Sequence, residues 1–207
     1  SALDAGGLTL ASVQDDAPYT YAGANGKSVN NYDRRYRGFT TLREAITDSI
    51  NIVTVKTLAQ AGVSLGWQYV QEYGFTTVDS RDMNEALALG GITQGVSNLE
   101  LTAAYAAIAN QGTYIKPKFY TKILDHDGNV LIDNTTPESH TVIKDTTAWL
   151  LTSAMEDVMT SGTGTSAYFG SSMAQAGKSG TTTSSRDALF AGYTPYYTCA
   201  RSEEHTS

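Results

Sequence analysis

Two extended segments near the end of the chain most constrain what it can fold into. Residues 173–182 and 188–197 are rich in small, hydroxyl-bearing and aromatic side chains, and only residues 183–187 separate them. A connection this short joins neighbouring strands as an antiparallel pair, because a parallel crossover needs a dozen or more residues. We therefore expect an antiparallel sheet that helices cover.

Helical patterns occupy much of the remaining chain. Thr41-Leu-Arg-Glu44 and Ser97-Asn-Leu-Glu100 each fit a capping box, in which a hydroxyl and a carboxylate satisfy reciprocal backbone N–H groups. The second box predicts a helix that runs to Ala109, and two further helices are predicted over residues 65–73 and 145–159. The last of these carries a stripe of apolar residues spaced three and four apart. The stripe consists of Ala148, Leu151, Met155 and Val158.

The other segments predict loops and one hairpin. Residues 1–39 are rich in Gly, Asn, Asp and Tyr without periodicity, so we expect extended loops there. Residues 120–124 and 129–132 flank Asp127-Gly128, a turn pair that tolerates positive φ, and therefore predict a β-hairpin. Together these patterns predict an α+β fold, with an antiparallel sheet flanked by helices in a sandwich-like arrangement.

Composition and charge exclude several classes of protein. The chain has 207 residues, of which 41% are hydrophobic, enough to bury the core of one domain. Its net charge is −7 and its basic residues form no stripe, so we expect no nucleic-acid partner. The single cysteine, Cys199, can form neither an internal disulfide nor a thiolate zinc site. We expect this thiol to be buried as a small hydrophobe, and we expect no metal or other cofactor.

We find no membrane-spanning segment and no signal peptide in these residues. No apolar run reaches the roughly 18 residues that a membrane-spanning helix needs. The first residues carry no basic segment of the kind that opens a signal peptide. We therefore expect any membrane anchor to lie upstream of this chain.

The segment Lys178-Ser179-Gly180-Thr181 is the first candidate site. On a strand the hydroxyls of Ser179 and Thr181 leave the same face, and Gly180 lets a ligand backbone lie close. Lys178 leaves the other face and must reach the site from beneath. These groups suit an anion, although polar decoration of an edge strand would look the same. A nucleotide-binding P-loop is disfavoured, because it requires glycine where Ser172 stands and a helix after the lysine.

The segment Ser49-Ile50-Asn51 is the second candidate site. A hydroxyl and an amide two residues apart at a helix junction can relay a proton and hold a peptide group. The same pattern occurs at Ser28-Val29-Asn30, so an ordinary hydroxyl near a helix end remains the alternative. No histidine is placed as a general base, which disfavours a Ser-His-Asp triad. The histidines are His126, His140 and His205.

An ordered set of short motifs surrounds both candidates and resembles the transpeptidase domain of bifunctional (class A) penicillin-binding proteins. The set runs from about residue 3 to residue 200. Its members are Asn31-Tyr-Asp33, Tyr36-Arg-Gly38, Thr41–Ala45, Ser49-Ile-Asn51, Ala88–Gly91, Gly95–Leu101, Ala104–Gly112, Gly162-Thr-Gly164, Ala176–Thr182 and Asp187–Pro195. The resemblance implies that residues 1–200 form a partial transpeptidase domain with the fold of DD-peptidases and serine β-lactamases.

The resemblance also implies a reaction and its partners. These enzymes cross-link peptidoglycan: a serine attacks the D-Ala-D-Ala bond of a stem peptide, releases the last D-Ala and passes the acyl group to an amine. β-Lactams mimic that dipeptide and trap the acyl-enzyme. By this resemblance Ser49 would shuttle a proton, Asn51 would hold the substrate amide, and Lys178 would hydrogen-bond Ser49 and favour the substrate carboxylate.

The same resemblance assigns the substrate-binding strand. The hydroxyls of Ser179 and Thr181 would bind the carboxylate, and the backbone N–H of Thr181 would form half of the oxyanion hole. Gly180 and Thr183 complete the expected substrate-binding residues. No histidine is needed in this family, because its base is a lysine.

Two departures from the family pattern matter. The Ser-x-x-Lys motif that holds the nucleophile and its base is absent, since no serine here has a lysine three residues on. We expect it just upstream, with a glycan-polymerising domain and a membrane anchor at the extracytoplasmic face of the bacterial cell membrane. The chain alone is then expected to be inactive. We also expect residues 201–207 to be a non-native tail that replaces a last strand.

Two alternatives to the class A synthase stay open. A serine β-lactamase or a monofunctional DD-carboxypeptidase would share the Ser-x-Asn and Lys-Ser-Gly segments. A non-catalytic sensor domain that binds β-lactams or muropeptides would have kept the fold and lost the serine.

Overall fold

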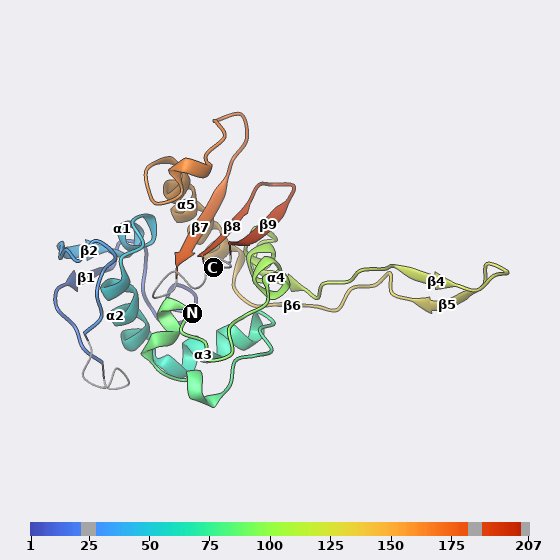
Figure 1. Cartoon of the computed structure of the whole chain (residues 1–207), viewed down its shortest axis with the longest axis horizontal. Helices are drawn as coiled ribbons and strands as arrows, with labels where there is room; N and C mark the ends of the chain where they lie inside the picture. The colour runs from blue at the N-terminus through green and yellow to red at the C-terminus, as the bar shows by residue number, and fades with distance from the viewer. Residues whose placement is uncertain (22–27, 182–187, 204–207) are drawn as a thin grey trace.

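The computed structural model describes residues 1–21, 28–181 and 188–203. Thr183, expected among the substrate-binding residues, lies outside them. Among the described residues, no helix is both long and apolar enough to cross a lipid bilayer. The chain contains five α-helices and four small antiparallel sheets within the described residues (Figure 1). The α-helices are α1 (Leu42–Thr47), α2 (Asn51–Ala61), α3 (Val63–Glu72), α4 (Asn98–Ala109) and α5 (Asp145–Thr160).

Three strands form the sheet that carries the first candidate site. β7 (Ala176–Thr181), β8 (Ala188–Tyr193) and β9 (Thr198–Glu203) are antiparallel neighbours in that order. Helix α5 packs against β7, and α4 packs against β8 and β9 (Figure 1). The predicted antiparallel sheet flanked by helices is therefore confirmed.

The second of the predicted strands ends earlier than expected, at Tyr193. Residues 194–197 form a turn that leads into β9: the N–H of Thr194 donates to the carbonyl of Tyr197 at 2.9 Å. Pro195 has no N–H to donate to a strand partner, which favours a turn there. Cys199 on β9 is exposed, so the prediction of a buried thiol is wrong. Although the residues before Cys199 are apolar and aromatic, the segment pairs as strand β9 of the sheet and leaves the thiol exposed.

Helix α5 supplies the core beneath the sheet. Its predicted stripe is confirmed: Ala148, Met155 and Val158 are buried, and Leu151 is partly buried against the same core. Met155 packs with Ala176 of β7 and Tyr193 of β8. The position of β7 is therefore fixed from below by the apolar face of α5.

Both predicted capping boxes are present. The Thr41 side chain accepts the N–H of Glu44 at the start of α1, and Ser97 accepts that of Glu100 at the start of α4. Helix α3 begins two residues earlier than expected, at Val63. Helix α2 was not among the predicted elements, because its N-cap residue, Ile50, has no side-chain cap that would mark the start of a helix in the sequence. The buried residues of α2 are Ile52, Val53, Val55 and Leu58.

The first 39 residues are not all loop. β1 (Val13–Asp16) pairs with β2 (Gly38–Thr41) in antiparallel register, from Val13 opposite Thr41 to Asp16 opposite Gly38. The prediction of loops is wrong for these strands, because their pairing joins segments more than 20 residues apart and leaves no local period. The pair delivers Asp16 to the interior, where its side chain is fully buried.

The predicted β-hairpin is confirmed and stands away from the body of the protein (Figure 1). β4 (Lys122–Leu124) pairs with β5 (Val130–Asp133), and Gly128 in the turn has φ 85°. β3 (Thr113–Ile115) pairs with β6 (Ser139–Thr141) at the base of this arm. Short 3-10 helices complete the described elements: η2 (Ser80–Asp82), η3 (Glu85–Leu89) and η4 (Thr165–Ala167).

Candidate functional site

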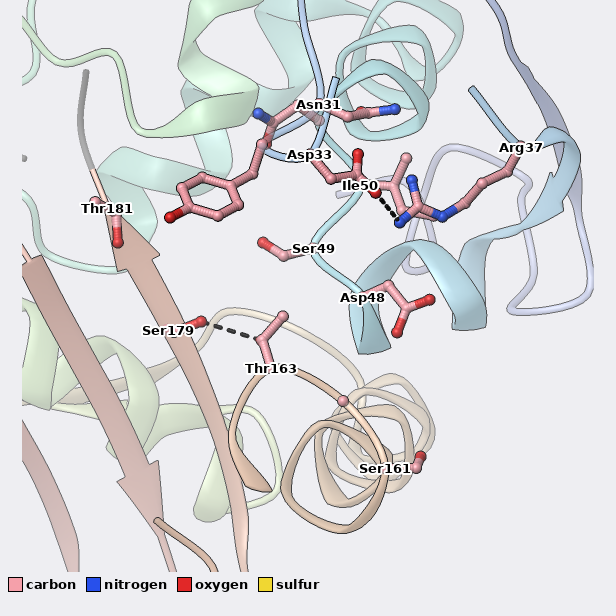
Figure 2. A pocket seen from close by; sticks show the side chains of 13 residues that line it. Asn31, Asp33, Arg37, Asp48, Ser49, Ile50, Ser161, Thr163, Ser179 and Thr181 are labelled. Atoms are coloured by element: carbon pink, nitrogen blue, oxygen red, sulfur yellow. Dashed lines mark hydrogen bonds and ion pairs between the residues drawn. The ribbon is translucent and has the colours of Figure 1, made fainter. Parts of the chain in front are cut away.

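A pocket of about 760 Å³ lies between the junction of α1 with α2 and the strand β7 (Figure 2). Four segments line it: a loop before β2, the helix junction, the loop after α5, and β7. The lining residues are Asn31, Tyr32, Asp33, Arg37, Asp48, Ser49, Ile50, Asn51, Ser161, Gly162, Thr163, Ser179 and Thr181. Both candidate segments of the sequence therefore meet at one pocket.

The helix junction presents Ser49 and Asn51 to the pocket. Ile50 between them is 1% exposed and packs with Leu42, Ala45 and Val53, so it anchors the corner in the core. Ser49 has φ 57°, in the left-handed region that residues with a side chain seldom occupy. Such a conformation persists only where its surroundings hold it. The buried Ile50 is one of those constraints.

Lys178 is not among the residues that line the pocket, but it contacts Ser49, which is one of them. Its Nζ donates to Ser49 Oγ at 2.8 Å and to the Ser179 carbonyl at 2.9 Å. This is the Lys178–Ser49 hydrogen bond that the family resemblance implied. Burial lowers the pKa of Lys178 from its ordinary 10.5 to about 8. A lysine with that pKa keeps its proton at neutral pH yet can release it at small energetic cost.

The opposite wall is β7, where Ser179 and Thr181 face the pocket as their spacing predicted (Figure 2). A Cβ at Gly180 would meet no described atom within 4 Å, so there is open space beside the strand. Within the described residues β7 is at the sheet edge, so an extended ligand could pair with its free side. The regular strand through Lys178 also excludes a P-loop, which needs a helix there.

Sequence reasoning missed the loop after α5 as part of the site. Thr163 Oγ1 lies 3.1 Å from Ser179 Oγ, and its N–H donates to the Thr47 carbonyl at 3.2 Å. Thr163 therefore links the β7 wall to the end of α1, directly before the Ser49 corner. A Cβ at Gly162 would lie 2.2 Å from the Thr47 carbonyl oxygen, which explains the glycine. The Gly162-Thr-Gly164 motif was the available signal.

The weaker sequence candidates lie elsewhere. Ser28 of the second Ser-x-Asn match does not line the pocket and lies 3.2 Å from Thr20 Oγ1. His140 contacts the carbonyl of Glu72, and His126 lies near Asp127. His205 falls outside the described residues. The described lining of the pocket therefore holds no imidazole.

Comparison with known proteins shows the family to which this chain belongs. The family model described as "Penicillin binding protein transpeptidase domain" matches residues 1–199. The chain belongs to this family. The resemblance inferred from the ordered sequence motifs is thereby confirmed.

Two curated relatives in this family align over most of the chain. Penicillin-binding protein 1F of Bacillus subtilis is 40% identical over 176 residues, 82% of this chain and 24% of the relative. Penicillin-binding protein 1A of Clostridium perfringens is 34% identical over 210 residues, 96% of this chain and 31% of the relative. The chain thus spans between 24% and 31% of the length of these two penicillin-binding proteins.

Solved penicillin-binding proteins share the fold. Penicillin-binding protein 1A from Haemophilus influenzae superposes with a TM-score of 0.81 and 27% identity, covering 93% of this chain and 34% of that one. Penicillin-binding protein A from M. tuberculosis, solved as an imipenem acyl-enzyme complex, also gives 0.81, at 18% identity over 98% of this chain and 51% of that one. The predicted α+β fold of the DD-peptidase and serine β-lactamase type is confirmed.

Proposed function

We propose that the pocket between Ser49 and β7 is the substrate cleft of a DD-transpeptidase that cross-links peptidoglycan through an acyl-serine. The observation that carries the proposal is the hydrogen bond from Lys178 Nζ to Ser49 Oγ at 2.8 Å. It joins the two sequence motifs at one pocket and gives a hydroxyl a titratable partner with a pKa of about 8. A hydroxyl and an amine in this relation can pass a proton to a leaving group.

The donor substrate is a stem peptide that ends in D-Ala-D-Ala. Its terminal carboxylate accepts hydrogen bonds from Ser179 and Thr181, whose hydroxyls face the pocket. Asn51 holds the substrate amide, and Gly180 leaves space for its backbone. The N–H of Thr181 stabilises the oxyanion, a contact typically worth roughly 3 kcal/mol.

The reaction has two acyl transfers. A serine Oγ attacks the carbonyl carbon of the penultimate D-Ala while the lysine of its Ser-x-x-Lys motif takes the hydroxyl proton, and the bond to the last D-Ala nitrogen breaks. Ser49 gives its proton to that nitrogen and regains one from Lys178. An amine of a second stem peptide then displaces the serine, whose oxygen takes one proton from that amine, and the cross-link is complete. The proton held by the lysine of Ser-x-x-Lys returns to Lys178. β-Lactams enter the first step only and stay bound to the serine.

The attacking serine belongs to a Ser-x-x-Lys motif that the chain does not contain. We propose that a longer product of the same gene supplies it, together with a glycosyltransferase domain and a membrane anchor. The transpeptidase then works at the extracytoplasmic face of the bacterial cell membrane. This 207-residue chain by itself forms no acyl-enzyme.

Labelling with a fluorescent penicillin tests the proposal in a gene product that includes Ser-x-x-Lys. We expect covalent labelling that survives denaturation, and roughly 100-fold slower labelling after Ser49→Ala, the range lost with one proton-transfer group. Ser28→Ala is the matched control, since Ser28 has the same Ser-x-Asn pattern outside the pocket. Equal labelling of wild type and Ser49→Ala would overturn the assignment.

The same protein distinguishes the two alternatives. A β-lactamase turns over nitrocefin many times, whereas a transpeptidase stops after one equivalent. A non-catalytic sensor gives no covalent label with the complete gene product. We expect one equivalent of stable label.

A further inference from the structure

A buried carboxylate lies next to the pocket without belonging to the proposed mechanism. Asp16, the last residue of β1, is fully buried. Asn31 Nδ2 donates to both of its oxygens, at 2.8 and 3.0 Å, and also to the Arg35 carbonyl at 2.8 Å. The N–H of Arg37 donates to Asp16 at 2.9 Å, and the Arg37 guanidinium lies 3.8 Å from the carboxylate. Removing a carboxylate from water is costly unless it is hydrogen-bonded, so these donors are what makes the position tolerable. Asp16 in turn fixes which way the Asn31 amide points.

Asn31 uses its remaining oxygen on α2. The side chain is 4% exposed, and its Oδ1 accepts the N–H of Ile52 at 3.2 Å. Helix α2 needs this acceptor, because its N-cap residue is Ile50, which has none in its side chain. A flipped amide would place its oxygen against the Asp16 carboxylate. Asn31 is therefore a helix cap supplied from a distant loop in one fixed orientation.

The cap acts at the corner that forms one wall of the pocket. Ile52 directly follows Asn51, and the Asn51 amide donates to the Asn30 carbonyl at 2.9 Å. The loop thus holds the start of α2 at two adjacent points, one through Asn30 and one through Asn31. Figure 2 shows Asn31 beside this corner, on the side of Ser49 away from Ser179. Since Ser49 has φ 57°, its hydroxyl direction depends on the corner being held.

We propose that Asn31 is a positioning residue for the Ser49–Asn51 corner and that Asp16 orients Asn31. The consequence for acyl transfer rests on the proposed function, while the consequence for α2 does not. The Asn31-Tyr-Asp33 motif of the sequence thereby gains a physical role. It holds a hydroxyl and an amide that contact substrate, without contacting the reacting atoms itself.

A charge exchange tests the proposal in the gene product that includes Ser-x-x-Lys. Asn31→Asp places a second carboxylate against Asp16, and the two like charges repel each other. We expect penicillin acylation to slow about tenfold, the factor for roughly 1.4 kcal/mol of lost positioning. Adding Asp16→Asn restores an amide–carboxylate pair in reverse, although the bond from position 31 to the Arg35 carbonyl stays lost, so the double variant should acylate faster than Asn31→Asp.

Asn30→Asp is the matched control, because it adds the same charge one residue away on an exposed side chain that lies outside the network. It should leave the rate unchanged. Wild-type rates in folded Asn31→Asp would overturn the proposal. So would a double variant that acylates no faster than folded Asn31→Asp. If the single variant does not fold, a double variant that also fails to fold would overturn the proposal.

A second measurement uses the 207-residue chain and does not depend on the proposed function. Hydrogen exchange by NMR reports whether the Ile52 N–H has an acceptor. In Asn31→Ala we expect this amide to exchange about tenfold faster than in Asn30→Ala. Equal exchange in the two variants would overturn the cap. The two experiments separate the two proposals. Equal exchange in Asn31→Ala and Asn30→Ala, together with normal penicillin labelling of the gene product that includes Ser-x-x-Lys, would refute the cap and leave the proposed function standing.

Discussion

Replacing Lys178 with methionine removes its buried ammonium group together with the hydrogen bonds to Ser49 and Ser179, and the pH dependence of stability then reports the titration of that ammonium. Burial lowers the pKa of Lys178 from 10.5 to about 8 in the folded protein. One pKa unit corresponds to about 1.4 kcal/mol, so folding disfavours the charged form by roughly 3 kcal/mol. Methionine fills a similar volume and carries no titrating group, which makes Lys178→Met a clean comparison.

The free energy of unfolding should rise with pH because of Lys178. Because the Lys178 pKa is lower in the folded state, the unfolded chain binds the extra proton between about pH 8 and pH 10.5. The free energy of unfolding therefore rises with pH across that interval, while the full penalty is present below it. We expect the free energy of unfolding of wild type, minus that of Lys178→Met, to increase by roughly 3 kcal/mol from about pH 7 to pH 10.5.

Urea denaturation at several pH values measures both proteins. The subtraction cancels the other groups that titrate at high pH, notably Tyr73, Tyr105 and Tyr193, whose pKa values burial raises. A difference that stays flat within about 1 kcal/mol would refute a buried ammonium at Lys178. If the difference in free energy of unfolding between wild type and Lys178→Met instead falls as pH rises, the pKa of Lys178 is raised by folding, which contradicts burial of its ammonium group.

Three further substitutions test the other supports of the site. Thr163→Val removes the hydroxyl near Ser179 and should slow penicillin acylation about tenfold, with Thr163→Ser restoring it; equal rates for Val and wild type would count against this bridge. Gly162→Ala would place a Cβ 2.2 Å from the Thr47 carbonyl oxygen, so its midpoint in thermal unfolding should drop by several degrees; an unchanged midpoint would show that the loop can move away. Ser97→Ala removes the cap of α4 and should lower the free energy of unfolding in urea by about 1 kcal/mol, whereas no change would contradict the capping box.

Local chemistry made much of the fold predictable. Capping boxes at Thr41 and Ser97 act within one helical turn, so a single sequence window contains all their partners. The period of α5 and the Asp127-Gly128 turn are equally local. The β1–β2 pair was not predictable in this way, since its hydrogen bonds join segments that the sequence keeps apart.

Some residues of the candidate site could likewise be predicted from local sequence spacing, and others could not. The hydroxyls of Ser179 and Thr181 share a face because strand geometry demands it, and their spacing alone showed this. Asn31 and Thr163 act through partners 21 and 16 residues away, so no spacing rule identifies them. Their motifs were visible, but only the folded chain shows what they contact.

Intact-mass spectrometry with benzylpenicillin tests the central claim, that this chain forms the walls of an acyl-transfer pocket without its nucleophile. The 207-residue chain should keep its mass after incubation and denaturation. A gene product that also contains Ser-x-x-Lys should gain the mass of one penicillin, and the Ser49→Ala variant should gain it far more slowly. A penicillin adduct on the 207-residue chain itself would contradict the account, because it would show a nucleophile among these residues.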